Sequence, residues 1–239
     1  MTGDTSRKRI MGFFDAYPVF EAEGTVAATL TRLNFRHDLF IAPARDMLAG
    51  KRVLDIASHD GRFALAALES GGAAHVTGIE ARGEAIARAR TVFDRCGIAP
   101  ERHDFVQGDV FDALAGMTPG AFDTAMVLGF LYHTPRQYEI FAQLDRLGVR
   151  DVIVDSMVLR TKKPRRALVE MRWEPTGREG QIFDPRGRAR ALSAVPSRAA
   201  LAMWLEEFGW QVSWPSLPPV PEDAKVYDRG GRVAVFGRR

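Results

Sequence analysis

Short apolar segments alternate with alanine-rich segments from Lys51 onward, and this alternation constrains the fold more than any other feature of the sequence. The apolar segments predict strands at residues 52–56, 75–80, 104–107, 122–128 and 151–155. Helices are expected between them at residues 62–70, 83–96 and 136–147. Because right-handed crossovers join parallel strands, the sequence predicts an α/β fold with a doubly wound sheet and helices on both faces.

The C-terminal part adds one helix and two strands to this pattern. Ser197 is suited to cap a helix that runs to Phe208, and Gly209 marks its end. Strands are expected at residues 210–214 and 232–236. No helix separates them, so we expect antiparallel neighbours that complete a Rossmann-like, seven-stranded mixed sheet.

The rest of the chain divides into a cap and an insertion. Residues 1–50 are expected to form an N-terminal helical cap, because apolar residues recur there at helical spacing. The residues that carry this pattern are Val26, Leu30, Leu33, Leu39, Ile41 and Met47. Residues 51–239 form the main domain, interrupted at residues 157–196 by an insertion in which we expect loops or a short hairpin.

Composition excludes several classes of protein. With 239 residues, 46% of them hydrophobic, the chain can bury one substantial core. Its single cysteine, Cys96, excludes a disulfide scaffold and a metal–thiolate site. No apolar run reaches the roughly 18–20 residues that a membrane span requires, and the polar N-terminus does not resemble a signal peptide. We therefore expect a cytoplasmic protein without a membrane partner.

Three acids follow the ends of the first three predicted strands. Asp55 ends the first strand and precedes a turn of small residues, Glu80 closes the second, and Asp109 follows the third. Ligands of open α/β sheets bind at this carboxyl edge. An acid at the second strand can accept hydrogen bonds from two ribose hydroxyls, and Asp109 can receive an adenine amine beside Val110.

Four segments resemble the motifs of class I S-adenosylmethionine-dependent methyltransferases: VLDIASHDG, GIEAR, QGDV and FDTAMVLGFLYH. The resemblance implies S-adenosylmethionine as cofactor, with Asp55 and its turn at the methionine part, Glu80 at the ribose, and Asp109 with Val110 at the adenine. The full cofactor set that it suggests is Asp55, Ser58, His59, Gly61, Arg62, Phe63, Glu80, Ala81, Asp109, Val110, Leu128 and Gly129.

The first motif departs from the family pattern. Ala57 and His59 stand where the family has glycines, and only the final glycine of the motif is present, as Gly61. Side chains of His59, Asp60 and Arg62 are therefore candidates to contact the cofactor carboxylate, although Arg62 would equally suit a solvated helix start. A dinucleotide-binding dehydrogenase is the competing interpretation, but the chain lacks its G-x-G-x-x-G turn and has the terminal antiparallel pair.

His133 follows the fourth predicted strand and is predicted to be the general base. Methyl transfer from a sulfonium requires positioning of two reactants and removal of the proton that an alcohol loses. Histidine accepts a proton near neutral pH, whereas a core histidine bonded to backbone is the alternative interpretation. Asp155, at the end of the fifth strand, is a second catalytic candidate, to orient His133, bind substrate hydroxyls or hold a metal with Glu170. No metal site is predicted.

The acceptor is suggested by a second resemblance. Leu131–His133 and the C-terminal helix are similar to sugar O-methyltransferases, including those of methylmannose polysaccharide synthesis, and to enzymes that modify the wobble uridine of transfer RNA. The chain lacks the long N-terminal extension of the second group, which favours a small hydroxylated molecule or saccharide. Tyr17 and Tyr132 are candidates to stack on a sugar face, and Glu170 completes the predicted substrate set.

Basic residues gather between residues 160 and 190, where ten Lys or Arg stand against four Asp or Glu although the whole chain carries only +3. Such a segment attracts phosphates, which makes RNA methylation the second candidate function. Only Trp173 and Phe183 are available there to stack on bases, so a solvated loop or a clamp over the substrate explains it equally well. A cofactor-binding module without catalysis is the third candidate. The sequence leaves the acceptor and the oligomeric state open, a homodimer included.

Overall fold

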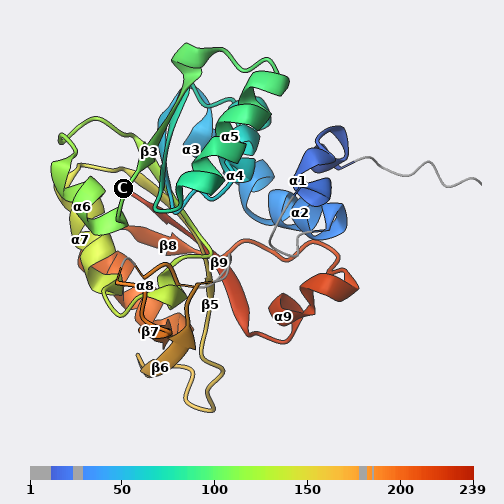
Figure 1. The fold of residues 1–239 in the computed structure, drawn as a ribbon. Helices are drawn as coiled ribbons and strands as arrows, with labels where there is room; N and C mark the ends of the chain where they lie inside the picture. Colours follow the sequence, from blue (N-terminus) through green and yellow to red (C-terminus); the bar gives the residue numbers. More distant parts are fainter. Residues whose placement is uncertain (1–11, 24–28, 178–181, 185) are drawn as a thin grey trace, which may run out of the picture.

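A seven-stranded mixed sheet forms the centre of the molecule (Figure 1). The computed structural model describes residues 12–23, 29–177, 182–184 and 186–239. Strand order is β3-β2-β1-β4-β5-β9-β8, with the first five strands parallel and β9 antiparallel to both of its neighbours. The strands are β1 (Arg52–Ile56), β2 (His75–Glu80), β3 (His103–Gln107), β4 (Thr124–Leu128), β5 (Asp151–Met157), β8 (Gln211–Ser213) and β9 (Arg232–Arg238). The predicted fold class, including the terminal antiparallel pair, is confirmed.

Helices cover both faces of this sheet and create two hydrophobic cores (Figure 1). One face carries α4 (Arg62–Glu69) and α5 (Gly83–Arg95), and the other carries α6 (Val110–Gly116), α7 (Gln137–Arg146) and α8 (Arg198–Glu207). Since successive strand residues point to opposite faces, Val53 packs in the first core, whereas Leu54 and Ile56 pack in the second. The same alternation turns Asp55, near the carboxyl end of β1, to the face on which Val53 lies.

Short helical segments precede β1. They are η1 (Phe13–Ala16), α1 (Val19–Ala22), α2 (Leu30–Arg36), the π-helical η2 (His37–Ile41), η3 (Ala42–Ala44) and α3 (Arg45–Leu48). Phe14, Leu33 and Phe40 are buried in the core that α4 also lines. Val26, part of the apolar pattern of this region, lies outside the described residues. Further short turns are η4 (Pro100–Arg102), η5 (Leu131–His133), η6 (Glu222–Ala224) and α9 (Lys225–Asp228). None of the described helices has both the length and the apolar character that crossing a bilayer demands.

The segment after β5 forms a separate antiparallel hairpin of β6 (Val169–Pro175) and β7 (Arg190–Pro196). Its strands are longer than the short hairpin expected there. Six of the seven residues of β6 are exposed and Glu174 alone is partly buried, so this strand lacks the apolar alternation that reveals a half-buried strand. Arg178 and Glu179, which belong to the basic segment, lie outside the described residues.

Candidate active site

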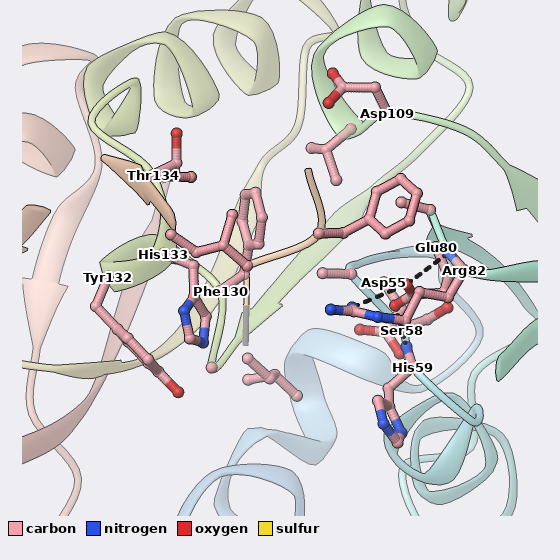
Figure 2. Close-up of a pocket in the computed structure, with 18 of the residues that line it drawn as sticks. Asp55, Ser58, His59, Glu80, Arg82, Asp109, Phe130, Tyr132, His133 and Thr134 are labelled. Atoms are coloured by element: carbon pink, nitrogen blue, oxygen red, sulfur yellow. Dashed lines mark hydrogen bonds and ion pairs between the residues drawn. The ribbon is translucent and has the colours of Figure 1, made fainter. Parts of the chain in front are cut away.

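A cavity of about 550 Å³ lies at the carboxyl ends of the parallel strands (Figure 2). This volume falls in the range of roughly 300–1,000 Å³ that ligand pockets occupy. The predicted cofactor residues that line it are Asp55, Ser58, His59, Arg62, Phe63, Glu80, Ala81, Asp109, Val110, Leu128 and Gly129. Of the other predicted site residues, Tyr132 and His133 line it, whereas Gly61, Asp155, Tyr17 and Glu170 do not.

The turn after β1 keeps a glycine-type backbone although two glycines are missing. Ala57 and His59 have φ values of 57° and 55°, and Gly61 has 76°. The left-handed conformation costs a residue with a side chain roughly 1–2 kcal/mol, so this turn is strained at two positions. Gly61 serves packing, because a Cβ there would lie 2.9 Å from the Phe93 ring.

Two buried polar atoms of this turn lack a partner among the described residues. Oδ2 of Asp55 and Oγ of Ser58 are both buried without a hydrogen bond. Burial first, and the charge of Glu80 second, raises the pKa of Asp55 to about 8. The charge of Arg36 opposes this shift only in part, and Oδ2 of Asp55 has no partner, so a ligand that brings a cation would stabilise this carboxylate.

Glu80 and Asp109 are held by backbone donors at the same rim. Oε2 of Glu80 accepts from the His59 amide at 3.1 Å, and Oε1 accepts from the Arg82 amide at 2.9 Å. Each carboxylate oxygen has a second lone pair, so both can accept from a ligand as well. Asp109 caps α6, because its Oδ1 accepts from the Phe111 amide at 2.9 Å. The cap orients this carboxylate beside Val110 at the cavity wall.

Arg62 is bound within the turn. Its Nε donates to Oδ1 of Asp60 at 2.6 Å, and both side chains are buried. Although burial alone would raise it, hydrogen bonds from His59 and Arg62 hold the pKa of Asp60 well below its usual range. The charge of Arg62 is therefore already compensated by Asp60, which argues against the predicted contact of Arg62 with a cofactor carboxylate.

His133 lies across the cavity from the acids, in η5, with Tyr132 beside it (Figure 2). Its Nδ1 is 2.8 Å from Oε1 of Glu174 on β6, and its side chain is 14% exposed. The hairpin thus supplies an acid to the histidine. Sequence reasoning missed Glu174, because no local spacing relates residues from segments that far apart.

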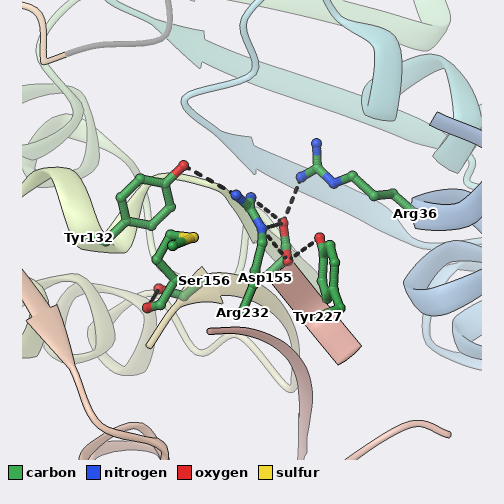
Figure 3. A network of polar contacts seen from close by, with 7 residues as sticks. Arg36, Tyr132, Asp155, Ser156, Tyr227 and Arg232 are labelled. Atoms are coloured by element: carbon green, nitrogen blue, oxygen red, sulfur yellow. Dashed lines mark hydrogen bonds and ion pairs between the residues drawn. The ribbon is translucent and has the colours of Figure 1, made fainter. Parts of the chain in front are cut away.

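Asp155 does not have the role that the sequence suggested. It is fully buried, and its carboxylate accepts from Nη2 of Arg36 and Nη2 of Arg232, each at 2.6 Å, and from Oη of Tyr227 at 2.8 Å (Figure 3). Burial opposes ionisation, but the charges of Arg232 and Arg36 hold the pKa of Asp155 well below its usual range. These partners use the carboxylate that was expected to orient His133, and Glu174 is the acid that contacts the histidine instead.

Two predicted substrate residues also lie elsewhere. The ring of Tyr17 packs on Phe13 at 5.0 Å between centroids, and Oε1 of Glu170 accepts from Nε of Arg172 at 2.6 Å on the exposed strand β6. The described residues contain no cluster of three His, Cys, Asp or Glu side chains suited to a metal, so the pairing of Asp155 with Glu170 has no geometric support. The lining residues that the sequence did not indicate include Arg32, Leu33, Arg36, Ile182, Phe183, Leu192 and Arg232.

Comparison with known proteins agrees with the fold of this chain. Residues 53–148 match a family model described as a methyltransferase domain. Similar solved structures include the N-terminal domain of EvdMO1, crystallised in the presence of SAH and D-fucose, with a TM-score of 0.59 and 19% identity over 82% of this chain and 79% of that one. An S-adenosylmethionine-dependent methyltransferase from Mesorhizobium loti gives 0.51 and 16% over 82% and 96%, and the [4+2]-cyclase SpnF gives 0.57 and 16% over 83% and 79%. At such identities the likeness concerns the fold. No curated protein matches the sequence.

Proposed function

We propose that the chain is an S-adenosylmethionine-dependent methyltransferase of the class I superfamily that methylates a hydroxyl of a saccharide or similar polar molecule, with His133 as general base. The observation that carries the proposal is that His133 and the acids of the strand edge line one cavity from opposite sides (Figure 2). We further propose residues 1–50 as a cap and 51–239 as the methyltransferase domain, with an insertion at 157–196.

The residues present fit the cofactor. When bound, S-adenosylmethionine supplies an electrophilic methyl group, and transfer of this group to an alcohol releases one proton. The unpartnered oxygens of Asp55 and Ser58 suit the ammonium of its methionine part, because both can accept a hydrogen bond from it. Glu80 suits the two ribose hydroxyls, and Asp109 suits the adenine amine.

The pair of His133 and Glu174 suits removal of that proton. The carboxylate of Glu174 lies 2.8 Å from Nδ1, although this contact does not have the geometry of a hydrogen bond. Its negative charge favours the tautomer that carries the hydrogen on Nδ1, which leaves Nε2 as the acceptor. A general base in this position contributes on the order of 100- to 10,000-fold to the rate. Glu174 positions the imidazole, and the hairpin that carries it places Phe183 and Leu192 in the cavity wall.

A small acceptor is favoured over RNA because arginines of the basic segment are paired with acidic side chains. Arg172 pairs with Glu170 and Arg188 pairs with Asp184, so these hairpin cations are already matched by acids. The N-terminal domain of EvdMO1, which is similar in fold, was crystallised in the presence of D-fucose, a hydroxylated sugar. RNA methylation remains the second candidate because of the remaining hairpin cations, and a module without catalysis is the third.

Labelled methyl transfer tests the proposal. Purified protein is incubated with labelled S-adenosylmethionine and with separate carbohydrate and RNA extracts, and the affinity for S-adenosylhomocysteine is measured by calorimetry. We expect label in carbohydrate, and His133→Ala should lower transfer by about 100-fold or more while its dissociation constant stays within about twofold of wild type. Glu174→Gln should cause a smaller loss of the same kind.

His75→Ala is the matched control, because His75 lies at the amino end of β2, outside the cavity lining. It should leave both quantities unchanged. Equal losses of transfer and cofactor affinity in His133→Ala would make His133 structural. Label in RNA alone would replace the saccharide by the second candidate, and cofactor binding without any transfer would favour the third.

A further inference from the structure

Three arginines line one end of the cavity. Arg32 and Arg36 come from α2, and Arg232 comes from the start of β9. Arg36 and Arg232 share the carboxylate of Asp155 (Figure 3). Nη1 of Arg32 donates instead to the backbone oxygen of Asp223 at 3.0 Å. Three guanidinium groups therefore stand against one buried carboxylate.

The neighbouring acidic groups do not remove this excess. Burial raises the pKa of Tyr227 to about 12, so its hydroxyl stays neutral. Asp55, which the charge of Arg36 also reaches, has its pKa raised to about 8 and is mostly protonated at pH 7. The carboxylate of Asp223 is exposed and accepts from the hydroxyl of Thr29. At this end, three guanidinium groups thus face the one buried ionised carboxylate of Asp155, and Asp223 is the exposed acid beside Arg32.

The other arginines of the cavity are compensated. Arg62 is paired with Asp60, Arg82 with Glu80, Arg136 with Glu139 and Arg188 with Asp184. The contrast shows that the excess is local to one wall.

Two of the three arginines converge on one point at the end of β4. A methyl group added at Gly129 would lie 3.0 Å from Nη2 of Arg232 and 3.8 Å from both Nη2 of Arg36 and Oη of Tyr132. Gly129 adopts φ +84°, and η5 with His133 follows it directly. A ligand in contact with this backbone would therefore meet several donors at once, close to the proposed base.

Hydrogen-bonding capacity remains in this cluster. The side chain of Arg36 is 13% exposed, and its buried Nε has no partner within the described part of the chain. Burial, followed by the charges of Arg232 and Arg36, lowers the pKa of Arg32, which shows that the three cations repel one another. An anion would relieve both costs, because guanidinium groups bind carboxylate and phosphate through paired hydrogen bonds.

We propose, resting on the proposed function, that the methyl acceptor carries an anionic group, a carboxylate or a phosphate, which Arg32, Arg36 and Arg232 bind. This contact holds the acceptor hydroxyl next to His133. Sugar acids and sugar phosphates are the matching substrate classes. The carboxylate of the cofactor's own methionine part is the competing ligand for the same arginines.

Binding to a matched series of sugars tests the inference. D-Galactose, D-galacturonate and D-galactose 6-phosphate differ only in the group at carbon 6. This group is a neutral hydroxymethyl in the first, a carboxylate in the second and a phosphate ester in the third. Their dissociation constants are measured by calorimetry on protein loaded with S-adenosylhomocysteine at constant ionic strength. At least one anionic sugar should bind about tenfold more tightly than D-galactose, and the preferred one identifies the source of the charge.

Arg32→Gln and Arg36→Gln are the test variants, because Arg36 makes one hydrogen bond to Asp155 and Arg32 makes none, whereas Arg232 makes three. Each should reduce the preference by about tenfold while the dissociation constant for S-adenosylhomocysteine stays within about twofold. Arg95→Gln is the control, since Arg95 is exposed, pairs with Glu23 and lies outside the cavity lining. It should keep the wild-type preference.

The outcomes separate this inference from the proposed function. If the two variants instead lose affinity for S-adenosylhomocysteine, the arginines bind the cofactor carboxylate and the inference is overturned. Equal binding of the three sugars to the wild-type protein would also overturn the inference. Labelled methyl transfer to extracts that are divided by anion exchange gives the second test. Label in neutral saccharides alone would overturn the inference that the acceptor is anionic but would keep the proposed function. Label only in acidic material that is not saccharide would keep the anionic acceptor but would overturn the saccharide acceptor of the proposed function.

Discussion

Replacing Asp55 by asparagine tests the electrostatics of the turn after β1. Burial, and next the charge of Glu80, raises the pKa of Asp55 from 3.8 to about 8. The folded protein therefore keeps this carboxyl protonated over a pH range in which the unfolded chain has lost the proton. Asparagine resembles the protonated carboxyl in size and polarity but cannot ionise.

Proton linkage gives the sign and the size of the effect. Because the folded state holds the proton more tightly, the free energy of unfolding falls as pH rises, by about 1.4 kcal/mol per pH unit between about pH 4 and pH 8. The slope vanishes outside this window, which limits the total to about 6 kcal/mol. Asp55→Asn removes this slope, so the variant should gain stability relative to wild type up to pH 8.

Urea denaturation of the ligand-free proteins, at several pH values between about 5 and 8, measures the difference. Asp60→Asn is the matched control in the same turn. Asp60 keeps a lowered pKa and stays ionised throughout this window, so its replacement should destabilise the protein by an amount that does not change with pH. A difference between wild type and Asp55→Asn that is also independent of pH would refute the reasoning.

Two further replacements probe the same rim. Ala57→Gly should raise the free energy of unfolding by about 0.5–1 kcal/mol, because glycine adopts the φ of 57° without strain. The greater conformational entropy of glycine in the unfolded chain offsets only part of this gain. A variant that is destabilised in urea denaturation would show that the turn is not strained there. Glu80→Ala should weaken the binding of S-adenosylhomocysteine, measured by calorimetry, by more than about tenfold through the loss of two charge-assisted hydrogen bonds. An unchanged constant would remove Glu80 from the ribose contact.

The sequence predicted the sheet well because its strands are local signals. β1 and β2 match their predicted bounds, since each is a buried apolar run between a turn and a helix. β5 extends two residues further than expected, because Ser156 and Met157 pair with β9. The helix α6 was missed because it has only seven residues, and Asp109 was assigned a ligand contact without its role as the cap of that helix.

The sequence predicted one end of the site and missed the other. The cofactor end consists of residues within or directly after strands, so their common edge follows from the order of the motifs. The proposed acceptor end joins α2, β6 and β9, and no spacing along the chain relates Arg36, Glu174 and Arg232. Side-chain direction was equally hidden, which is why Tyr17 and Glu170 were placed in a cavity that neither of them lines.

Two buried aspartates on the sheet explain how the cavity distinguishes its proposed ligands. Asp155 has two guanidinium groups beside it and a lowered pKa, whereas Asp55 has an unpartnered oxygen and a raised one. Asp55 thus lies at the end of the cavity where a positive charge is missing, and Asp155 lies at the end where positive charge is in excess. A cationic methyl donor stabilises the first end and an anionic acceptor stabilises the second. The opposite binding orientation would leave both ends uncompensated, and His133 would then face the wrong ligand.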